Sequence, residues 1–478
     1  MSETNTSDIQ CFVAGAAVEH LPQIEYSISE ISARLGIRIE VSCDRSKGPF
    51  HLVYGEEVTD ARTVCLPYNP RCYDGTGLFK ALGDPLLWAH ESVDKPEATD
   101  IIGGVFRLLA FSDELQVCPK DRDRRGIFST TSLPKQRFAV RAEPIVENHT
   151  KVILRSLHQL NPNQSTIDKW PGGKKWALLL THDTDAVSIS AKPELAFNFV
   201  KGITRHPLRF KMVLDGFRHM LKPLEKNPLY GFSKWKEAEN AKDIQSAFYL
   251  YFRHGLSLDL SDWRSSVGDA DFKWEELRSM AKDGWEFGLH PPIHAKTSIN
   301  EFIKGKEFLE DKLEQPIFGL RHHYWALDWR KPHLTYRKHV NSGFRYDLSI
   351  AWRDSVGFRA GTCLPFRPWD PAREKGLDIY SIPTAIMDGH IIPMRDGDDF
   401  DIEECSKAAE DVIRSVSENG GVLTLDWHTE SACNSYFYKG HIQVLDKILH
   451  KILAHDDVWV TTPWELTKHW HQRRNELS

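Results

Sequence analysis

The amino-acid sequence predicts an α/β protein in which a parallel barrel follows a smaller N-terminal α/β domain. Three observations support this prediction. Short apolar runs alternate with helical patterns in the second part of the chain, a polar linker precedes that part, and 478 residues suit two domains. Strands that alternate with helices form parallel sheets, because a crossover helix usually connects parallel strands. We therefore place the domains at residues 1–165 and 166–478.

The N-terminal part contains three short β-like runs and then a helical pattern. The runs span residues 37–44, 50–55 and 63–68, and the helical pattern spans residues 100–115. Residues 160–175 are rich in proline, glycine, asparagine and serine, which is typical of a linker. Because nothing in this part indicates whether it binds a substrate, a partner or another copy of the chain, we predict an accessory domain.

Seven apolar runs in the second part are predicted strands: residues 176–181, 244–251, 285–290, 317–321, 343–346, 378–383 and 421–427. Two helices between them have recognisable ends. The first ends on Gly284, a typical residue after a helix, and the second begins with Ser298 and Glu301 at capping-box spacing. Roughly sixty residues separate the first two strands, which predicts an insertion with its own helices beside a substrate cleft.

Composition limits the possible classes of function. The net charge of −6, with both signs interspersed, indicates no nucleic-acid-binding surface. No apolar run approaches the ~18 residues of a transmembrane segment. We interpret the basic stretch from Arg205 to Lys222 as a solvated helix face.

Two further features bear on localisation. The N-terminus lacks the basic and apolar regions of a secretory signal, and the eight cysteines are scattered, as is typical of reduced thiols. We therefore expect a cytoplasmic protein. The sequence does not indicate its oligomeric state.

Polar side chains gather where the predicted strands end, and catalytic residues of parallel barrels lie at that position. Four strand ends carry them: Asp183 and Asp185, then His290 and His294, then Arg321 and Tyr324, and last Asp426 and His428. Two carboxylates one residue apart raise each other's pKa unless a cation lies beside them. We therefore expect a cation near Asp183 and Asp185.

The spacing of His290 and His294 indicates a metal ion. Both imidazoles can reach one ion if Pro291 and Pro292 begin a tight turn. One carboxylate and two imidazoles leave open positions on a metal such as zinc, which is typical of catalytic sites. Taken singly, each feature has an ordinary explanation, because two of 22 histidines can fall four apart by chance. Their joint order at strand ends favours a metal site.

These motifs resemble those of the polysaccharide deacetylases of the NodB-homology type, the carbohydrate esterase family 4 superfamily, across residues 174–470. The resemblance implies a distorted (β/α)7 TIM-like barrel and one divalent metal ion, for which Zn²⁺ is the first choice. It implies that Asp183 is the general base. It also implies that Asp185, His290 and His294 are the metal ligands.

The third motif of that family, an arginine followed three residues later by an aromatic residue, matches Arg321 and Tyr324. The resemblance implies that Arg321 balances the charge of the base and that the backbone near Tyr324 faces the oxyanion. His323 replaces the proline of the family pattern, so the backbone here is expected to differ.

The last motif, a strand ending in a histidine, matches His428 with one extra residue before it, which implies that His428 is the general acid. An aspartate that orients this acid is either Asp347 or Asp388. We favour Asp388, because it lies at a later strand end, nearer to His428.

The resemblance implies a metal-dependent hydrolase that removes N-acetyl or O-acetyl groups from a saccharide or a polysaccharide-biosynthesis intermediate. Two alternatives remain open. The same metal site suits a hydrolase of cyclic amides or imides. A carbohydrate-binding barrel without turnover is the other, since 15 tryptophans and 24 phenylalanines would serve sugar stacking.

Overall fold

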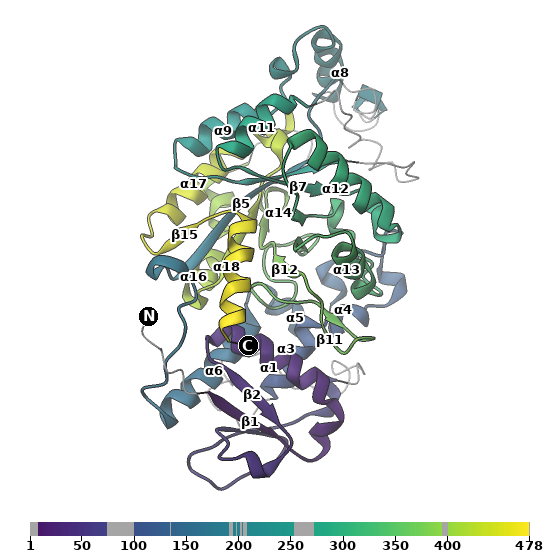
Figure 1. Ribbon diagram of the computed structural model, residues 1–478. Helices are drawn as coiled ribbons and strands as arrows, with labels where there is room; N and C mark the ends of the chain where they lie inside the picture. The colour runs from purple at the N-terminus through teal and green to yellow at the C-terminus, as the bar shows by residue number, and fades with distance from the viewer. Residues whose placement is uncertain are drawn as a thin grey trace.

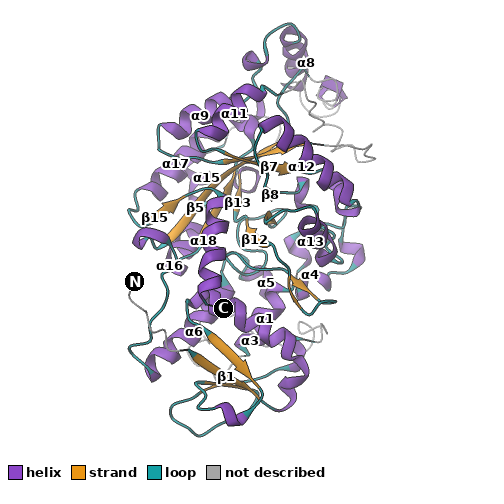
Figure 2. Ribbon diagram, in the orientation of Figure 1, coloured by secondary structure: helices purple, strands orange, loops and turns teal. Residues whose placement is uncertain are grey.

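The computed structural model describes residues 8–73, 100–133, 135–190, 195–196, 198–200, 203, 208–252, 272–393 and 400–477. Within these ranges two parallel sheets organise the chain. A four-stranded sheet belongs to the N-terminal part, and a nine-stranded sheet belongs to the second part. Figure 1 shows the first sheet at the bottom of the molecule and the second above it, and Figure 2 shows the helices that surround both.

The N-terminal sheet has the strand order β2-β1-β3-β4, and its neighbouring strands pair in parallel. Its strands are β1 (Ile9–Val13), β2 (Ile39–Ser42), β3 (Leu52–Tyr54) and β4 (Val64–Leu66). The helices of this part are α1 (Leu21–Leu35), α3 (Ile101–Leu109), α4 (Ser112–Leu115), α5 (Lys135–Ala139) and α6 (Ile145–Leu160). Strand β1, which was not predicted, lies inside the sheet between two predicted strands.

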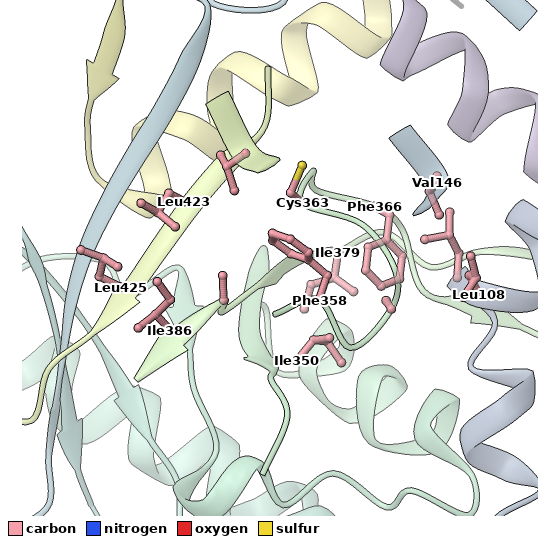
Figure 3. Close-up of a cluster of buried hydrophobic side chains, with 14 of the residues drawn as sticks. Leu108, Val146, Ile350, Phe358, Cys363, Phe366, Ile379, Ile386, Leu423 and Leu425 are labelled. Atoms are coloured by element: carbon pink, nitrogen blue, oxygen red, sulfur yellow. The ribbon is translucent and has the colours of Figure 1, made fainter. Parts of the chain in front are cut away.

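A continuous apolar core joins the N-terminal part to the second part. Leu108 and Val146 from the first belong to the same buried cluster as Phe358 and Phe366 from the second (Figure 3). Buried Arg34 crosses the same boundary, since it bonds to Glu147 and to Thr362. The domain boundary near residue 165 stays a prediction, and the apolar contact across it is extensive.

The larger sheet has the order β12-β9-β8-β7-β6-β5-β14-β13, with β15 also beside β5. Its strands are β5 (Trp176–Thr184), β6 (Ala247–Tyr251), β7 (Glu286–His290), β8 (Gly319–Leu320), β9 (Tyr346–Ile350), β12 (Tyr380–Pro383), β13 (Ile386–Met387), β14 (Val422–Asp426) and β15 (Val458–Val460). The neighbouring strands of this sheet pair in parallel, so the predicted parallel α/β architecture is confirmed. A short antiparallel pair, β10 (Trp369–Asp370) and β11 (Lys375–Gly376), lies outside it.

One chain segment forms both edges of this sheet. Strands β12 and β13 are separated only by Thr384 and Ala385. The Thr384 N–H donates to the Ile350 carbonyl of β9 at 2.8 Å, and the Ala385 N–H donates to the Thr424 carbonyl of β14 at 3.2 Å. Residues 380–387, here called the closing segment, therefore curl the sheet round on itself as in a TIM-like barrel.

Helices cover this sheet as the alternating pattern predicted. They are α8 (Leu208–His219), α9 (Phe232–Asn240), α11 (Trp274–Lys282), α12 (Ile299–Leu313), α13 (Pro332–Asn341), α14 (Asp388–Ile391), α15 (Ile402–Lys407), α16 (Glu410–Asn419), α17 (His441–Leu453) and α18 (Pro463–Glu476). In the part of the chain that the structure describes, no helix combines the length and apolar character needed to span a bilayer.

Two local predictions need correction. The predicted strand at 343–346 begins only at Tyr346, because Gly343, with a φ of 81°, lies in the connection from α13 to β9. The predicted capping box does not form, since the Ser298 side chain makes no capping hydrogen bond. The Glu301 carboxylate lies 3.5 Å from His294 Nε2 instead. Gly284 follows α11 with a φ of 104°, as predicted.

Two tyrosines fill the barrel interior, and two glycines make room for them. The Tyr249 and Tyr346 hydroxyls are 2.9 Å apart, and Tyr346 also donates to Glu286. A Cβ at Gly288 would overlap the ring of Tyr249, and one at Gly319 would overlap the ring of Tyr346. The strands can approach these rings only because both positions lack a side chain.

We expect Gly319→Ala to destabilise the protein by about 1–3 kcal/mol or more, because the new methyl group displaces a buried ring from its hydrogen bonds. Urea denaturation followed by tryptophan fluorescence measures this change. An unchanged unfolding midpoint would show that Tyr346 moves aside without cost.

Candidate active site

The carboxyl ends of several neighbouring strands bring the predicted functional residues to one end of the barrel. Asp183 lies in β5, His290 ends β7, and Arg321 directly follows β8. A cavity of about 320 Å³ opens there, and Asp183, Asp185, His290, His323 and His428 line it. The rim where parallel barrels carry their functional side chains therefore encloses a cavity in this protein.

Three side chains in this cavity form a candidate metal centre. Possible ligand atoms of Asp185, His290 and His323 all lie within 4.8 Å of one another. Asp185 Oδ1 is 3.1 Å from His290 Nε2, and Asp185 Oδ2 is 3.4 Å from His323 Nε2. One carboxylate and two imidazoles are a donor set that suits zinc in catalytic sites.

The hydrogen bonding of His290 fits a metal ligand. Its Nδ1 lies 2.6 Å from the Arg321 carbonyl oxygen, which can only accept, so Nδ1 carries the proton. In the neutral ring, Nε2 then presents a lone pair toward Asp185 Oδ1, a buried oxygen without a well-formed hydrogen bond. Two lone pairs that face each other at this distance are unfavourable unless a proton on Nε2 or a metal ion lies between them. A ligating histidine usually has this arrangement, with its other nitrogen bonded to a carbonyl.

The charge state of Asp185 agrees with this arrangement. Burial raises the pKa of its carboxyl, but the imidazoles of His323 and His290 outweigh burial and hold that pKa well below its ordinary value. The carboxylate is therefore ionised at neutral pH, as a metal ligand must be.

His294, the third ligand implied by the family resemblance, lies outside this group of ligand atoms. Residues 293–297 form a 3₁₀ helix after Pro292, whose backbone is extended, and His294 Nε2 lies 3.5 Å from Glu301 Oε1 of α12. His294 thus contacts a helix, while His323 from the next strand end lies beside Asp185 and His290.

Asp183, the predicted base, is held by Arg321. Arg321 Nη1 donates to Asp183 Oδ1 at 3.0 Å, and Nη2 donates to the Thr181 hydroxyl at 2.7 Å. The same Nη1 lies 2.8 Å from Oδ1 of Asp426, a fully buried carboxyl at the end of β14. The predicted pairing of Arg321 with Asp183 is present, and a second carboxyl shares the arginine.

The two carboxyls on Arg321 differ in charge. Burial raises the pKa of Asp426 to about 8 even though Arg321 lowers it. Asp426 is therefore mostly protonated at neutral pH, so that the positive charge of Arg321 is left to balance Asp183. Arg321 thus gives the predicted base a fixed cationic partner and a fixed orientation.

On the other side of the cavity, His428 is oriented by Asp388. The ring Nδ1 of His428 lies 2.9 Å from Asp388 Oδ1, and the backbone N–H of His428 donates to Asp388 Oδ2 at 3.1 Å. The Ser431 hydroxyl and the Gly389 N–H also donate to this carboxylate. Burial lowers the pKa of His428, but Asp388 outweighs burial and raises that pKa well above its ordinary value. His428 Nε2 lies 4.0 Å from Asp185 Oδ2.

Asp347, the other aspartate considered for this role, lies elsewhere. Its oxygens accept from the N–H and hydroxyl of Ser349, and Oδ2 is 3.6 Å from His339 Nδ1. Of the two aspartates, Asp388 is therefore the one that contacts His428.

Asp388→Asn should move the alkaline limb of the pH–rate profile to lower pH. The Asp388 charge stabilises the protonated imidazole, so its removal lowers the pKa of His428, and a general acid is lost once it is deprotonated. We expect the limb to fall by about 1–3 pH units. Steady-state rates across the pH range measure it. Asp347→Asn is the matched control, and an equal displacement in that variant would contradict the assignment.

Tyr324 lies at the cavity in a rare backbone conformation. Tyr324 has a φ of 57° and Trp325 a φ of 53°, a left-handed conformation that costs roughly 1–2 kcal/mol for each residue with a side chain. The Arg125 guanidinium carbon lies 4.3 Å from the centre of the Tyr324 ring. Strained backbone of this kind clusters at functional sites, which is compatible with the predicted place of Tyr324 beside the oxyanion.

Segments far apart in the sequence complete the walls of the cavity. Arg125 and Ile127 come from the N-terminal part, and Arg209 and Met212 come from α8 in the insertion after β5. The insertion thus contains helices and borders a cleft, as predicted. The contribution of the N-terminal part was not predicted.

Sequence reasoning gave no role to three residues at these strand ends. His323 and Asp426 were noted at these strand ends, and their nearness in sequence to Tyr324 and His428 was the signal for a role. His182 has a structural place, because its ring bonds to the Trp427 carbonyl and to Glu239 and packs against Phe248.

No family model matches this chain, and no curated protein matches it. Solved structures that are similar to it include the following three. A candidate polysaccharide deacetylase from Mycobacterium smegmatis has 17% identity and a TM-score of 0.43, over 65% of this chain and 95% of that chain. Another from Pseudomonas aeruginosa PAO1 has 16% identity and a TM-score of 0.41, over 65% and 95%. Puue allantoinase has 14% identity and a TM-score of 0.40, over 63% and 92%.

Proposed function

We propose that this protein is a metal-dependent deacetylase of the NodB-homology type, which removes an acetyl group from an N-acetylated sugar. The observation that carries the proposal is the convergence of three units on one cavity. These units are a carboxylate held by an arginine, a histidine held by a carboxylate, and the cluster of Asp185, His290 and His323. Amide hydrolysis requires a base, an acid and a centre that stabilises the oxyanion.

In this proposal Asp183 accepts the proton of the attacking water, while Arg321 balances the charge of the carboxylate and orients it. His428 donates a proton to the departing nitrogen, and Asp388 keeps His428 protonated until that step. The backbone N–H of Tyr324 faces the oxyanion. Asp183 and His428 line the same cavity, so a substrate there can contact both.

Asp185, His290 and His323 would hold the divalent ion, and zinc is the ion that their donor atoms suit best. When bound, such an ion polarises the amide carbonyl and lowers the pKa of a coordinated water to about 7. His294 is not among the proposed ligands, because its Nε2 lies near Glu301.

The aromatic side chains of the cavity favour a sugar as the substrate in this proposal. Tyr324, Trp325, Phe437 and Tyr438 line it beside the catalytic groups. Aromatic rings with a polar edge bind the mixed apolar and hydroxyl faces of a sugar ring well.

Acetate release from N-acetylglucosamine oligosaccharides by the zinc-loaded protein tests the proposal. A parallel assay of ring opening with a cyclic imide, such as hydantoin, tests the alternative hydrolase. Release of acetate without ring opening would support the deacetylase, and the reverse would replace it. Saccharide binding without either reaction would favour the binding barrel.

A further inference from the structure

The exposed large apolar side chains of this protein concentrate in one place, the insertion that follows β5. They are Phe199, Val200, Ile203, Phe210, Leu214, Phe217, Met220 and Leu221, and their exposed fractions range from 38% to 97%. In the rest of the described chain only Val18, Leu115 and Tyr324 belong to this class. A contiguous apolar surface of this kind is uncommon on a protein that faces water alone, and it marks an interaction site.

One side of helix α8 is buried against the rest of the protein and borders the cavity, and the other side is exposed. Met212 is buried at the catalytic cavity, and Gly216 is packed so closely that a Cβ there would meet Leu195 and the Ile189 backbone. Phe210, Leu214 and Phe217, spaced four and three residues apart, are exposed. Figure 1 shows α8 at the end of the molecule opposite the N-terminal sheet.

An apolar groove runs along this exposed side. Its volume is about 520 Å³, and its walls are entirely apolar: Leu195, Ala196, Phe199, Phe210, Val213, Leu214 and Phe217. Together with Met220 and Leu221, these residues form what we call the α8 surface.

The charge of the same segment is opposite to that of the whole protein. Residues 199–222 contain six lysines and arginines and one carboxylate, in a chain with a net charge of −6. Lys211, Arg218 and Lys222 are exposed beside the apolar side chains. The one carboxylate, Asp215, is bonded to Arg218 and to the Tyr436 hydroxyl. The basic stretch is therefore solvated at these three cations, as predicted, and it borders the apolar side chains.

We propose that the α8 surface docks on an anionic lipid bilayer, with its apolar side chains among the acyl chains and its cations at the headgroups. An exposed apolar stripe flanked by lysine and arginine is the pattern of interfacial helices. The charge disfavours a second copy of this chain as the occupant, because two such surfaces would bring like charges together.

Docking in this way would place the catalytic cavity close to the headgroups. Arg209 and Met212 of the same helix line that cavity. The inference does not depend on the reaction that the cavity performs, so vesicle binding and acetate release test separate statements.

Flotation of the full-length protein with vesicles tests the proposal. We expect binding to vesicles of phosphatidylcholine and phosphatidylglycerol in a two-to-one mixture, and much weaker binding to phosphatidylcholine alone. Binding should weaken as salt screens the headgroup charge. Failure of the wild-type protein to bind the mixed vesicles would overturn the proposal.

Two double variants identify the residues responsible. Leu214→Ser with Phe217→Ser, and Lys211→Gln with Lys222→Gln, should each reduce the apparent affinity for the mixed vesicles about tenfold or more. Val18→Ser with Leu115→Ser is the control, because these side chains are exposed elsewhere. Because all the changed residues are exposed, folding should be unaffected, and circular dichroism checks this.

Light scattering tests the competing occupant. A dimer that forms in the absence of lipid, and that the Leu214→Ser, Phe217→Ser variant abolishes, would assign the surface to a second copy and overturn the proposal. A monomer that binds the mixed vesicles would support the bilayer.

Discussion

Asp183→Asn is expected to remove nearly all turnover while the protein still binds its metal. The substitution keeps the size of the side chain but removes the group that accepts a proton, and loss of a general base costs about 10²–10⁴-fold in rate. Asp183 is not one of the three clustered ligands, so metal content should stay at that of the wild type. Acetate-release kinetics and elemental analysis on the same preparation measure both effects.

Asp426→Asn is the matched control for this variant. Asp426 contacts the same arginine atom, but it is fully buried and mostly neutral near pH 7, so an amide there changes the charge little. Its effect on turnover should be much smaller. If Asp183→Asn turned over substrate at the wild-type rate, another group would have to be the base.

His323→Ala is expected to lose both the bound metal and the activity, whereas His294→Ala should keep both. His323 supplies one of three clustered ligand atoms, and His294 lies beside Glu301. Removal of an outer partner of a metal ligand already costs about 10–100-fold in affinity, and loss of a ligand should cost more. Elemental analysis after dialysis against a weak chelator measures the difference.

His290→Ala serves as the positive control, because His290 belongs both to the sequence motif and to the cluster of three possible ligands. Retention of metal in His323→Ala together with its loss in His294→Ala would restore the ligand set implied by the motif resemblance. It would also require the segment after Pro292 to rearrange when the ion binds.

The contrast between His294 and His323 shows which spatial neighbours a sequence motif can predict and which it cannot. The spacing of His290 and His294 reports only their distance along one segment, and a 3₁₀ helix in that segment leads His294 toward α12. His323 is 33 positions from His290, but β7 and β8 are neighbours, so their ends are adjacent. Adjacency across strands depends on the order of the sheet, which the spacing within one motif does not contain.

The same reasoning explains which strands could be predicted. Strands of five or more residues, such as β5 and β14, are recognisable because their side chains are largely apolar and buried on both faces. β13 has two residues and β15 three, and each is defined only by its pairing with a neighbour. Asp388 was favoured for its place at a late strand end, and its contact with His428 depends on the short strand that precedes it.

The closing segment has a consequence for how this chain can be cut and rejoined. Asp388 directly follows β13, and the Thr384 hydroxyl lies 3.4 Å from Arg321 Nη2. The stretch that completes the barrel therefore contacts the partner of the proposed base and carries the partner of the proposed acid. New termini or an inserted tag between residues 380 and 388 would separate the acid from its aspartate even if every helix formed. Circular permutants should therefore tolerate breaks in exposed connections elsewhere, and a split between Thr384 and Ala385 should yield two fragments without a working active site.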